Sequence, residues 1–382
     1  MRRVGRRSPR PRVVIAGLGD TGLLVAIHLG PGFEVVGIST KPCLVSGQEL
    51  GTRLTRPEVW KQNYLMSFGR YPRLDDVQVL QGRITDLDTS AQQVTVTLPD
   101  GDQQIEPYDA LVISSGVANG FWRNDALEDL TNIRDGIRRA AEQIAEADSI
   151  AIIGGGATGV SVAANVRERY PDKTVHFFYS EPQPLPGYHP KVRQRIEDHL
   201  ERIGVELHPG HRALIPEGFA FDRFTTGPVS WSTGQIPFEA ALTLWSVGHV
   251  RPNNSFIPGD MLDERGFVRT DQFLRVPGYP NVFAVGDIAA TDPHRSSARN
   301  WGYRLVAHNV RATLKGKEHA MKQYSPPPYR WGSILGVQED GLRVFRPDGS
   351  SFRFPRWAVQ RLLFPVAVGK VIYRGIRRAT ST

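Results

Sequence analysis

The chain has 382 residues, of which 40% are hydrophobic and 23% charged, enough apolar material for the cores of two or three soluble domains. Its single cysteine excludes a disulfide-stapled secreted fold and an internal pair of redox cysteines. The formal net charge is +8, but residues 1–12 and 353–382 together carry thirteen positive charges and no acid, which leaves the body between them at −5. This distribution argues against nucleic-acid binding by a folded face and favours contact of the basic ends with an anionic membrane surface or an acidic partner.

The two ends give no sign of membrane insertion or secretion. The arginine-rich residues 1–12 lack an apolar signal-peptide core, and we predict that they form a disordered tail. The longest apolar run spans residues 362–369, far below the roughly 20 residues that a membrane span needs. We therefore expect a cytoplasmic protein.

Residues 13–29 form the first recognisable unit, an apolar strand followed by a glycine-rich turn and an apolar helix. Gly17, Gly19 and Gly22 have the G-x-G-x-x-G spacing of a turn that holds a pyrophosphate. The first glycine permits a tight bend, the second lets the backbone approach the phosphates, and the third lets the helix pack closely on the strand. Free N–H groups at the helix N-terminus then face the anion, helped by the helix dipole.

The strand after this helix, residues 33–38, is expected to end beside the ribose of such a nucleotide. The acid that usually bonds the ribose is missing there, and we predict that Ser39 or Lys41 bonds the ribose or a phosphate instead. Cys43 follows, and two interpretations of it stay open: a reactive thiolate favoured by the nearby Lys41, or an inert small residue.

The same pattern returns in the middle of the chain. Residues 150–165 contain an apolar strand, a second G-x-G-x-x-G turn with Gly154, Gly156 and Gly159, and the start of a helix. The next strand ends at Ser180, again without the expected acid. No negative charge there would repel the 2′-phosphate of NADPH, so NADPH is as plausible as NADH. Arg193 or Arg195 is a candidate cation for that phosphate. Two such units predict an α/β fold with two Rossmann-like domains.

Three further strands are expected to deliver small residues to the sheet edge at which ligands of open α/β sheets bind. They end at Gly116, at Gly248 and at Gly286-Asp287. The Asp287 carboxylate is predicted to accept hydrogen bonds from a polyol chain, to cap a helix expected to start just after it, or to do both.

Taken in this order, the motifs resemble those of the two-dinucleotide-domain flavoproteins over about residues 13–315. Within that family the chain resembles the apoptosis-inducing-factor-like NAD(P)H:quinone oxidoreductases, including the ferroptosis-suppressor type, and more distantly the type II NADH dehydrogenases. The residues predicted to contact FAD are Gly17, Gly19, Gly22, Ser39, Lys41, Gly116, Gly286 and Asp287. Those predicted to contact NADH or NADPH are Gly154, Gly156, Gly159, Ser180 and Gly248.

The resemblance also implies an arrangement of domains. It places an FAD-binding domain at residues 13–120 and 248–320 and inserts an NAD(P)H-binding domain at residues 121–247. Disulfide reductases of this superfamily use a cysteine pair that this chain lacks, so the chemistry is expected to be that of the cofactors. No catalytic residue is predicted; Asn300 and Trp301 are candidates for lining the acceptor pocket, with plain helix packing as the alternative.

The histidines give no metal site in the sequence. His208 and His211 flank a Pro-Gly turn without a nearby acidic or cysteine cluster, and we interpret them as surface residues. His28 lies among apolar residues of the first helix and is interpreted as a buried histidine with a hydrogen-bond partner.

The C-terminal segment, residues 321–382, begins with a proline-rich boundary followed by an expected strand pair. A basic amphipathic helix is expected after Pro365, with Lys370, Arg374, Arg377 and Arg378 on one face. That helix is predicted either to lie on an anionic membrane or to pack on the protein itself.

The predicted activity is hydride transfer from NAD(P)H to flavin, followed by transfer of two electrons to a quinone-type acceptor at the inner membrane face. Two alternatives stay open: a reductase for an iron–sulfur carrier such as a ferredoxin or rubredoxin, and a slowly turning-over redox sensor. Neither the oligomeric state nor the preference between NADH and NADPH follows from the sequence.

Overall fold

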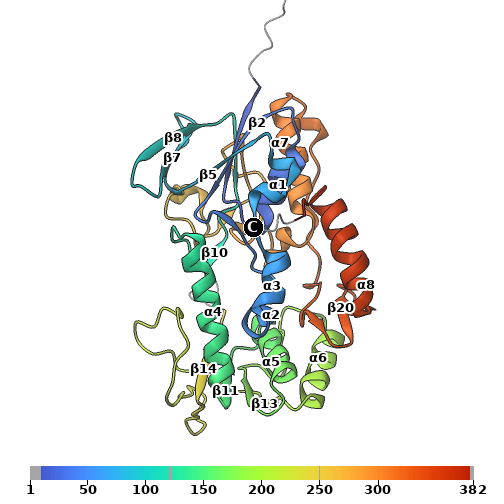
Figure 1. Ribbon diagram of the computed structural model, residues 1–382. Coiled ribbons are helices and arrows are strands. Elements are labelled where there is room, and N and C mark those ends of the chain that lie inside the picture. The colour runs from blue at the N-terminus through green and yellow to red at the C-terminus, as the bar shows by residue number, and fades with distance from the viewer. Residues whose placement is uncertain (1–9, 120–122, 249, 379–382) are drawn as a thin grey trace, which may run out of the picture.

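The computed structural model describes residues 10–119, 123–248 and 250–378, so most of the predicted N-terminal tail lies outside the described residues. Two separate parallel sheets confirm the predicted α/β class (Figure 1). We call the part built on the five-stranded sheet the first lobe and the part built on the four-stranded sheet the second lobe. The strands of the first sheet, in spatial order, are β5 (Val77–Gln81), β2 (Glu34–Ser39), β1 (Arg12–Ala16), β9 (Ala110–Ile113) and β17 (Val282–Ala284).

The second sheet repeats the arrangement of the first. Its strands, in spatial order, are β13 (Glu206–His208), β12 (Thr174–Phe178), β11 (Ser149–Ile153) and β14 (Leu242–Trp245). In both sheets the strand that carries the glycine-rich turn is central, with the next strand of the chain on one side and a later strand on the other. This is the strand order of doubly wound nucleotide-binding sheets, in which ligands bind where the order reverses.

Helices pack on the two sheets through their apolar residues. Most of these helices are apolar on one side only, whereas the helices that follow the glycine turns are apolar around most of their circumference. α4, for example, buries Ile133, Ile137, Ala140 and Ile144 at helical spacing and is capped by Asp129, whose carboxylate accepts a hydrogen bond from the Asn132 N–H at 2.8 Å. The helices are α1 (Asp20–Leu29), α2 (Leu50–Thr55), α3 (Pro57–Tyr64), α4 (Leu130–Glu146), α5 (Ala157–Arg169), α6 (Pro190–Arg202) and α7 (Gly302–Leu314).

Short strands complete the first lobe and the crossings between the lobes. A three-stranded antiparallel sheet, β6 (Arg83–Asp88), β7 (Gln93–Thr97) and β8 (Gln103–Pro107), flanks the first lobe. The remaining pairs are β3 (Cys43–Val45) with β4 (Leu65–Ser67), β10 (Val117–Ala118) with β15 (Arg251–Pro252), and β16 (Val268–Arg269) with β18 (Ala289–Ala290).

The pair β10–β15 ties together the two crossings of the chain between the lobes. The Ser115 hydroxyl donates to the Asn253 carbonyl at 2.8 Å, and the Asn253 side-chain amide donates to the Ser115 carbonyl, also at 2.8 Å. These reciprocal bonds fix the end of β9, which leads into Gly116, against the return strand.

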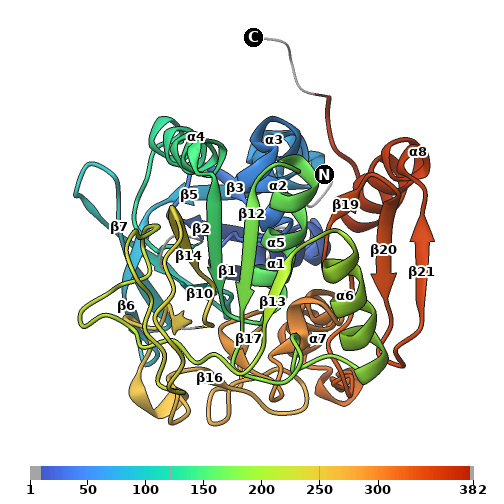
Figure 2. The same cartoon turned by 90° about the horizontal axis from the view of Figure 1, so that it is seen from below.

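The C-terminal segment packs on both lobes. It contains a small antiparallel sheet of β19 (Val337–Gln338), β20 (Gly341–Phe345) and β21 (Ser351–Phe354), which lies beside α6 in Figure 2. On the second lobe, the Asn165 amide donates to the Leu335 carbonyl at 2.7 Å. On the first lobe, the Tyr373 ring lies 5.1 Å from that of Tyr71, and Arg377 pairs with Asp75 at 2.8 Å.

The predicted division of the C-terminal helix at Pro365 is wrong. α8 (Arg356–Ala358) continues into η6 (Val359–Ile372), a π-helix that runs through Pro365. In an α-helix a proline ring clashes with the carbonyl four residues earlier. A π-helix has more residues per turn, so that carbonyl no longer lies opposite the ring. The helix ends before Arg374, which has a φ of 53°, so Arg374, Arg377 and Arg378 do not extend its basic face. Docking of Tyr373 and Arg377 on the first lobe explains this early end.

His28 is buried with a partner, as predicted. Its Nε2 donates to the Ile372 carbonyl at 3.0 Å, so it joins α1 to the C-terminal segment. Burial lowers the pKa of His28 to about 4, and the neighbouring Arg374 and Arg304 add to this effect, whereas the hydrogen bond to Ile372 opposes it.

We expect the stability of the protein to fall as the pH drops from about 6.5 to 4. In this window the unfolded chain binds a proton at His28 that the folded chain excludes, and the loss from this group is about 2–3 kcal/mol. Replacing His28 with glutamine keeps a donor for the Ile372 carbonyl without a titrating group. Urea unfolding between pH 4.5 and 8 should therefore show a shallower pH dependence for His28→Gln; equal slopes would contradict this role for His28.

Candidate functional site

The carboxyl ends of the first sheet bring together residues from four separate parts of the chain. In the parallel register Ala16 lies beside Ile38 and Ile113, and Ile113 lies beside Ala284. The residues at and just after these strand ends therefore meet at one edge. They are Gly17, Ser39, Gly116, Gly286 and Asp287.

In the turn between β1 and α1, a Cβ atom would meet different surroundings at each of the three glycines. A Cβ on Gly17, which has a φ of +115°, would lie 2.5 Å from the Ser114 carbonyl oxygen. One on Gly22 would lie 1.8 Å from the Gly17 carbonyl oxygen, whereas one on Gly19 would meet no atom within 4 Å. Two glycines thus permit close packing, and the third leaves open space beside the backbone.

The turn between β11 and α5 reproduces this geometry. A Cβ on Gly154 (φ +118°) would lie 2.3 Å from the Ser246 carbonyl oxygen, and one on Gly159 would lie 2.2 Å from the Gly154 carbonyl oxygen. The space at Gly156 is open, as at Gly19. In each lobe a serine hydroxyl also braces the turn: Ser114 donates to the Gly17 carbonyl at 2.8 Å and Ser246 to the Gly154 carbonyl at 3.1 Å.

Both turns fit the phosphates of a dinucleotide. At the N-terminus of α1 and of α5 no capping side chain accepts a hydrogen bond from the first N–H groups of the helix. Together with the open space at Gly19 and Gly156, this leaves an anion cradle at each helix start. Two such cradles on one chain suit two nucleotides.

Asp287 pairs with Arg123, a residue that the sequence analysis missed. The Arg123 guanidinium donates to the Asp287 carboxylate at 2.5 Å and to the Gly47 carbonyl at 3.3 Å. Burial acts to raise the pKa of Asp287, but Arg123 outweighs it and holds this pKa below its usual value. The site therefore keeps an ionised carboxylate at the end of β17.

The helix expected directly after Asp287 is absent, so its predicted role as a helix cap is wrong. The chain continues instead into β18, and α7 begins only at Gly302. Asp292, not Asp287, organises the connection, since its carboxylate accepts a hydrogen bond from the His294 N–H at 2.8 Å. Asp287 therefore caps no helix, and its contact with a polyol chain stays a prediction.

The end of β2 carries a charge pair in place of the usual acid. Ser39 accepts a hydrogen bond from the Lys41 N–H at 3.1 Å, and the Lys41 ammonium contacts Glu128 and the Asn124 side chain, the latter at 2.7 Å. Burial lowers the pKa of Lys41, and Glu128 opposes this effect. A carboxylate thus does reach this position, but it comes from Glu128, which precedes α4 and follows the end of β2 by almost ninety residues.

In the second lobe, Ser180 is exposed just past the end of β12, and Gly248 has a φ of +74°. Arg193 donates to the Pro184 and Gln183 carbonyls at 3.0 and 2.8 Å, so it braces the loop that follows Ser180. Arg195 does not point to this loop, because it donates to the Ser351 hydroxyl at 2.6 Å.

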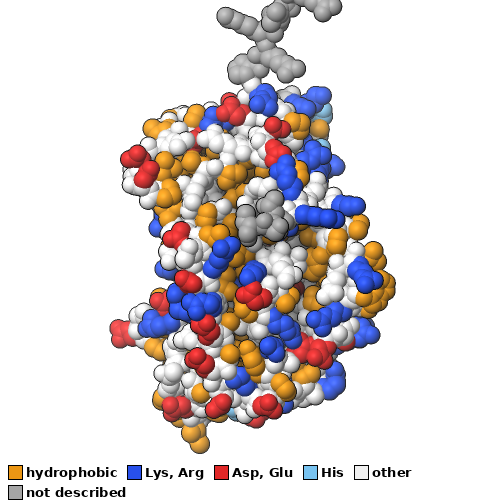
Figure 3. All heavy atoms as spheres, viewed as in Figure 1, with side chains coloured by type: hydrophobic (Ala, Val, Ile, Leu, Met, Phe, Trp, Pro, Cys, Tyr) orange, Lys and Arg blue, Asp and Glu red, His pale blue; other side chains and the backbone are white. Residues whose placement is uncertain are grey.

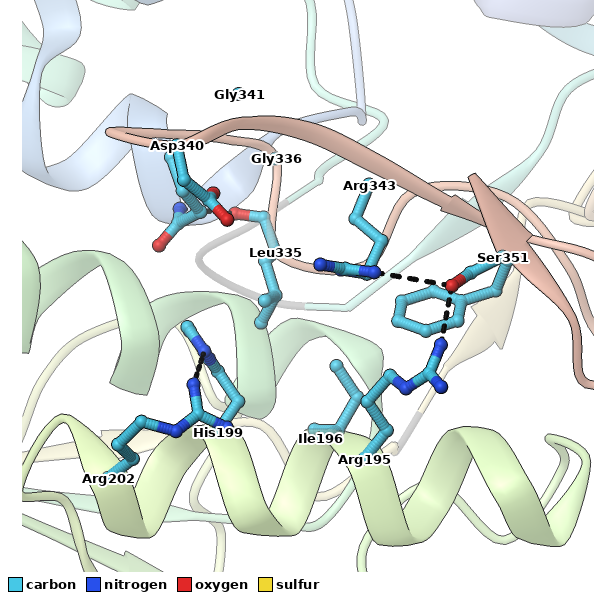
Figure 4. A pocket seen from close by; sticks show the side chains of 12 residues that line it. Arg195, Ile196, His199, Arg202, Leu335, Gly336, Asp340, Gly341, Arg343 and Ser351 are labelled. Atoms are coloured by element: carbon cyan, nitrogen blue, oxygen red, sulfur yellow. Dashed lines mark hydrogen bonds between the residues drawn. The ribbon is translucent and has the colours of Figure 1, made fainter. Parts of the chain in front are cut away.

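Arg195 instead lines a cavity of about 410 Å³ between α6 and the C-terminal sheet. Figure 4 shows Arg195 and Arg343 converging on Ser351, with His199 and Arg202 nearby. Apart from Arg195, none of the residues predicted to contact a nucleotide lines this cavity. We therefore exclude it from the candidate site.

Asn300 and Trp301 lie at the start of α7. The Asn300 amide donates to the Ser325 carbonyl at 2.5 Å, which ties down the C-terminal segment. Trp301 is exposed, with the Arg304 guanidinium 4.3 Å from its ring centre. These contacts give both residues structural partners, and their role in an acceptor pocket stays a prediction.

A group of aromatic side chains lies where the C-terminal helix meets the first lobe. The Phe364 ring is 6.2 Å from that of Tyr64, and Tyr373 packs on Tyr71. Burial raises the pKa of all three tyrosines, and the negative charge of Asp20, in the first turn of α1, adds to each rise. The Asp20 carboxylate accepts a hydrogen bond from the Gly47 N–H at 2.9 Å, and the neighbouring Ser46 N–H donates to the Tyr64 carbonyl at 2.8 Å, so Tyr64 lies near the start of α1.

Glu49, just before α2, is a second residue that the sequence analysis missed. Burial raises the pKa of Glu49 to about 7, although the Thr52 hydroxyl and the Val337 N–H oppose the rise. Its charge also raises the pKa of Tyr64, which places it near the aromatic group. Burial thus favours the protonated form of this carboxyl.

The structure favours the inert interpretation of Cys43. The thiol is buried in β3, and burial raises its pKa to about 11 despite the opposing charge of Arg134. We expect an aromatic disulfide reagent, which reacts with accessible thiols, to modify Cys43 at pH 8 only after the protein is unfolded in urea. Cys43→Ala should change the rate of NAD(P)H oxidation less than about twofold; a large loss would show that the thiol takes part in the reaction.

Residues 11–312 match the pyridine nucleotide-disulphide oxidoreductase family. The chain is 29% identical over 290 residues to the type II NADH:quinone oxidoreductase Ndh of Mycobacterium tuberculosis, a match covering 65% of this chain and only 60% of that protein. It is 24% identical over 364 residues to ferroptosis suppressor protein 1 of Xenopus tropicalis, covering 87% of this chain and 88% of that one.

Among solved structures, NDH2 from Plasmodium falciparum in complex with NADH superposes with a TM-score of 0.68 at 11% identity, covering 92% of this chain and 93% of that one. Agreement at this identity concerns the fold. Together with the two cradles, the family match assigns FAD and either NADH or NADPH as the cofactors of an oxidoreductase. The chain belongs to the pyridine nucleotide-disulphide oxidoreductase family.

Proposed function

We propose that the protein passes a hydride from NADH or NADPH to FAD and then two electrons to a quinone. The first lobe, residues 13–120 and 248–320, would hold FAD, and residues 121–247 would hold the nicotinamide nucleotide. The duplicated cradle is the main support for this proposal. In each lobe two glycines of the turn leave no room for a Cβ atom, and the third has open space beside it at a helix N-terminus.

Each lobe would contribute its own contacts. The FAD diphosphate would lie at the start of α1 beside Gly19, and the Asp287 carboxylate would accept hydrogen bonds from hydroxyl groups, after exchange of its bond to Arg123. Lys41 contacts both Ser39 and Glu128 at the end of β2, and these three residues would lie beside the ribose. When bound, FAD supplies the two-electron chemistry, and the side chains bind, orient and exclude water.

The aromatic group supports a quinone as acceptor. Tyr64 and Phe364 are half-buried and offer apolar ring surface where the C-terminal helix meets the first lobe, near the buried pair Tyr71 and Tyr373. Reduction of a quinone to a quinol consumes protons, and the Glu49 carboxyl is proposed to hold one of them near Tyr64. The mycobacterial relative bears the name of a quinone oxidoreductase, which agrees with this choice.

The C-terminal helix supports a membrane-bound acceptor. Trp357, Leu362 and Val371 are 59%, 53% and 54% exposed, and Arg356, Arg361 and Lys370 are exposed on the same helix. Figure 3 shows apolar side chains interspersed with lysine and arginine where Figure 1 places α8. In the described residues, no helix is both long and apolar enough to cross a bilayer. We therefore propose peripheral binding at the cytoplasmic face of a membrane.

Anaerobic titration of the flavin-loaded protein with NADH and with NADPH tests the first half-reaction. The oxidised flavin absorbance is expected to bleach with one equivalent of the preferred nucleotide. A panel of acceptors then tests the second half-reaction, with a short-chain quinone expected to give the fastest turnover. Turnover only with an iron–sulfur protein would overturn the quinone assignment, and bleaching without rapid turnover of any acceptor would favour a sensor.

The membrane proposal is best tested with surface variants, because truncation would also remove Tyr373 and Arg377 from the fold. The double variant Leu362→Gln/Val371→Gln is expected to lower binding to anionic liposomes at least about fivefold, since it removes apolar area from the exposed helix face. Ile236→Gln, at an exposed apolar position of the second lobe, is the matched control. Equal co-sedimentation of all three proteins would reject the helix as the membrane contact.

A further inference from the structure

Two strands of the second lobe place a histidine–glutamate–histidine group at one edge of the sheet. β12 and β13 are parallel, with His176 beside Glu206 and Phe178 beside His208. Because side chains alternate along a strand, His176, Glu206 and His208 project from the same face. From the sequence, His208 was grouped with His211 as a surface residue; its partner His176, 32 positions earlier in the chain, is revealed only by strand pairing.

The spacing of these side chains suits a common metal ion. The His176 Nδ1 atom lies 3.0 Å from the Glu206 Oε2 atom and 3.3 Å from the His208 Nε2 atom. Neighbouring ligand atoms that share a zinc ion, at about 2.0–2.2 Å from it, lie about 2.8–3.6 Å apart in octahedral or tetrahedral geometry. One ligand atom from each of the three side chains lies within 4.8 Å of the other two, so all three can reach one ion.

Hydrogen bonding alone leaves this group short of protons. A carboxylate only accepts hydrogen bonds, and a single proton on the His176 Nδ1 atom cannot make a full bond to both Glu206 and His208. A neutral imidazole offers the lone pair of one ring nitrogen to a ligand. A divalent cation would satisfy all three acceptors at once.

The surroundings hold the ligands in place yet leave access from solvent. The His208 ring stacks on Phe178 with centres 4.2 Å apart, and the His176 ring lies 4.5 Å from that of Phe238. Glu206, in contrast, is 55% exposed in its side chain. Ligand rings fixed by packing lose little entropy on binding, and the exposed carboxylate gives an ion a route of entry.

We propose that His176, Glu206 and His208 form a binding site for one divalent transition-metal ion of the zinc class. Imidazole nitrogen with one carboxylate is a ligand set typical of Zn²⁺ and unsuited to Mg²⁺ or Ca²⁺, which prefer oxygen ligands. With three protein ligands, the ion keeps at least one position for water. The site is separate from the two cradles and requires neither nucleotide.

A bound ion would link β13 to β12 and steady the end of β12. The Tyr179 N–H donates to the His208 carbonyl at 3.2 Å, and the His211 N–H donates to the Tyr179 carbonyl at 2.9 Å. Tyr179 directly precedes Ser180, so the ion would stiffen the strand end at which the nucleotide loop begins. We expect metal to stabilise the second lobe against unfolding.

Untagged, chelator-treated protein titrated with Zn²⁺ by calorimetry tests the site. We expect one Zn²⁺ per chain and a rise in melting temperature, and Co²⁺ should give visible absorption bands typical of bound cobalt. His208→Ala is expected to abolish this binding. Glu206→Gln, an exposed change that preserves the shape of the side chain, should weaken it at least tenfold.

His319→Ala is the matched control, since it removes an exposed histidine from a part of the chain outside this group. It should bind Zn²⁺ as the unchanged protein does. If the unchanged protein binds no Zn²⁺, or if Glu206→Gln and His208→Ala both retain full affinity and stoichiometry, the proposal is wrong. Far-ultraviolet circular dichroism of each variant separates lost binding from lost folding.

Discussion

Gly22→Ala is expected to destroy the first lobe and its flavin site together, whereas Gly19→Ala is expected to remove flavin from a protein that stays folded. A methyl group on Gly22 would lie 1.8 Å from the Gly17 carbonyl oxygen and 2.5 Å from the Ser114 hydroxyl, which are both fixed by the turn. Relief requires α1 to move from the core, which we expect to cost about 3 kcal/mol or more.

At Gly19 the same methyl group meets no protein atom within 4 Å, and its φ of −73° is ordinary for any residue. The methyl group would instead occupy the space that a diphosphate needs beside the backbone. We expect the flavin affinity to fall at least about tenfold, equivalent to about 1.4 kcal/mol. The flavin-to-protein absorbance ratio and the thermal unfolding of the flavin-free protein measure the two effects separately.

Gly32→Ala is the control, because its methyl group meets open space at an exposed position away from the turn. It should match the unchanged protein in both measurements. A yellow Gly19→Ala protein with full flavin content would show that the cradle at α1 does not hold the cofactor.

The glycine turns could be predicted because their chemistry is local. Each strand, turn and helix is contiguous, and the steric demands on Gly17 and Gly22 arise within a few residues and one neighbouring strand. Parallel pairing then brings Gly116 and Asp287 to the same edge, as the general architecture of such sheets requires. The fold class and the meeting of these strand ends at one edge of the sheet were therefore accessible from the sequence.

The residues that were missed act across long sequence separations. Arg123 meets Asp287 from 164 positions away, and Glu128 reaches Lys41 across 87. The sequence pattern does not distinguish a charged residue that pairs with a distant one in the fold from a charged residue that faces solvent. The pairing of Phe364 with Tyr64 and of His176 with His208 likewise depends on tertiary contacts.

The error in the C-terminal helix has a similar origin. Local rules placed a break at Pro365 and continued a basic face to Arg378. Tertiary contacts decided otherwise, because Tyr373 packs on Tyr71 and Arg377 pairs with Asp75 only if the chain leaves the helix after Ile372. The exposed apolar face that remains lies before this point, at Trp357, Leu362 and Val371.

Gly156→Ala is expected to leave the flavin in place while weakening the binding of the NADH or NADPH that reduces it. The methyl group meets no protein atom within 4 Å at a φ of −78°, so the second lobe should fold normally. It would occupy the space proposed for the nicotinamide nucleotide diphosphate at the start of α5. The nucleotide concentration that half-saturates flavin reduction should rise at least about tenfold.

Dithionite does not need the second cradle and should bleach the flavin of Gly156→Ala as it does that of the unchanged protein. Gly136→Ala, in α4, is the control, because its methyl group also meets open space and alanine favours a helix. The pair Gly19→Ala and Gly156→Ala thus tests which lobe holds which nucleotide. A colourless Gly156→Ala protein beside a yellow Gly19→Ala protein would reverse the assignment, since each methyl group can exclude only the diphosphate that lies against its own helix.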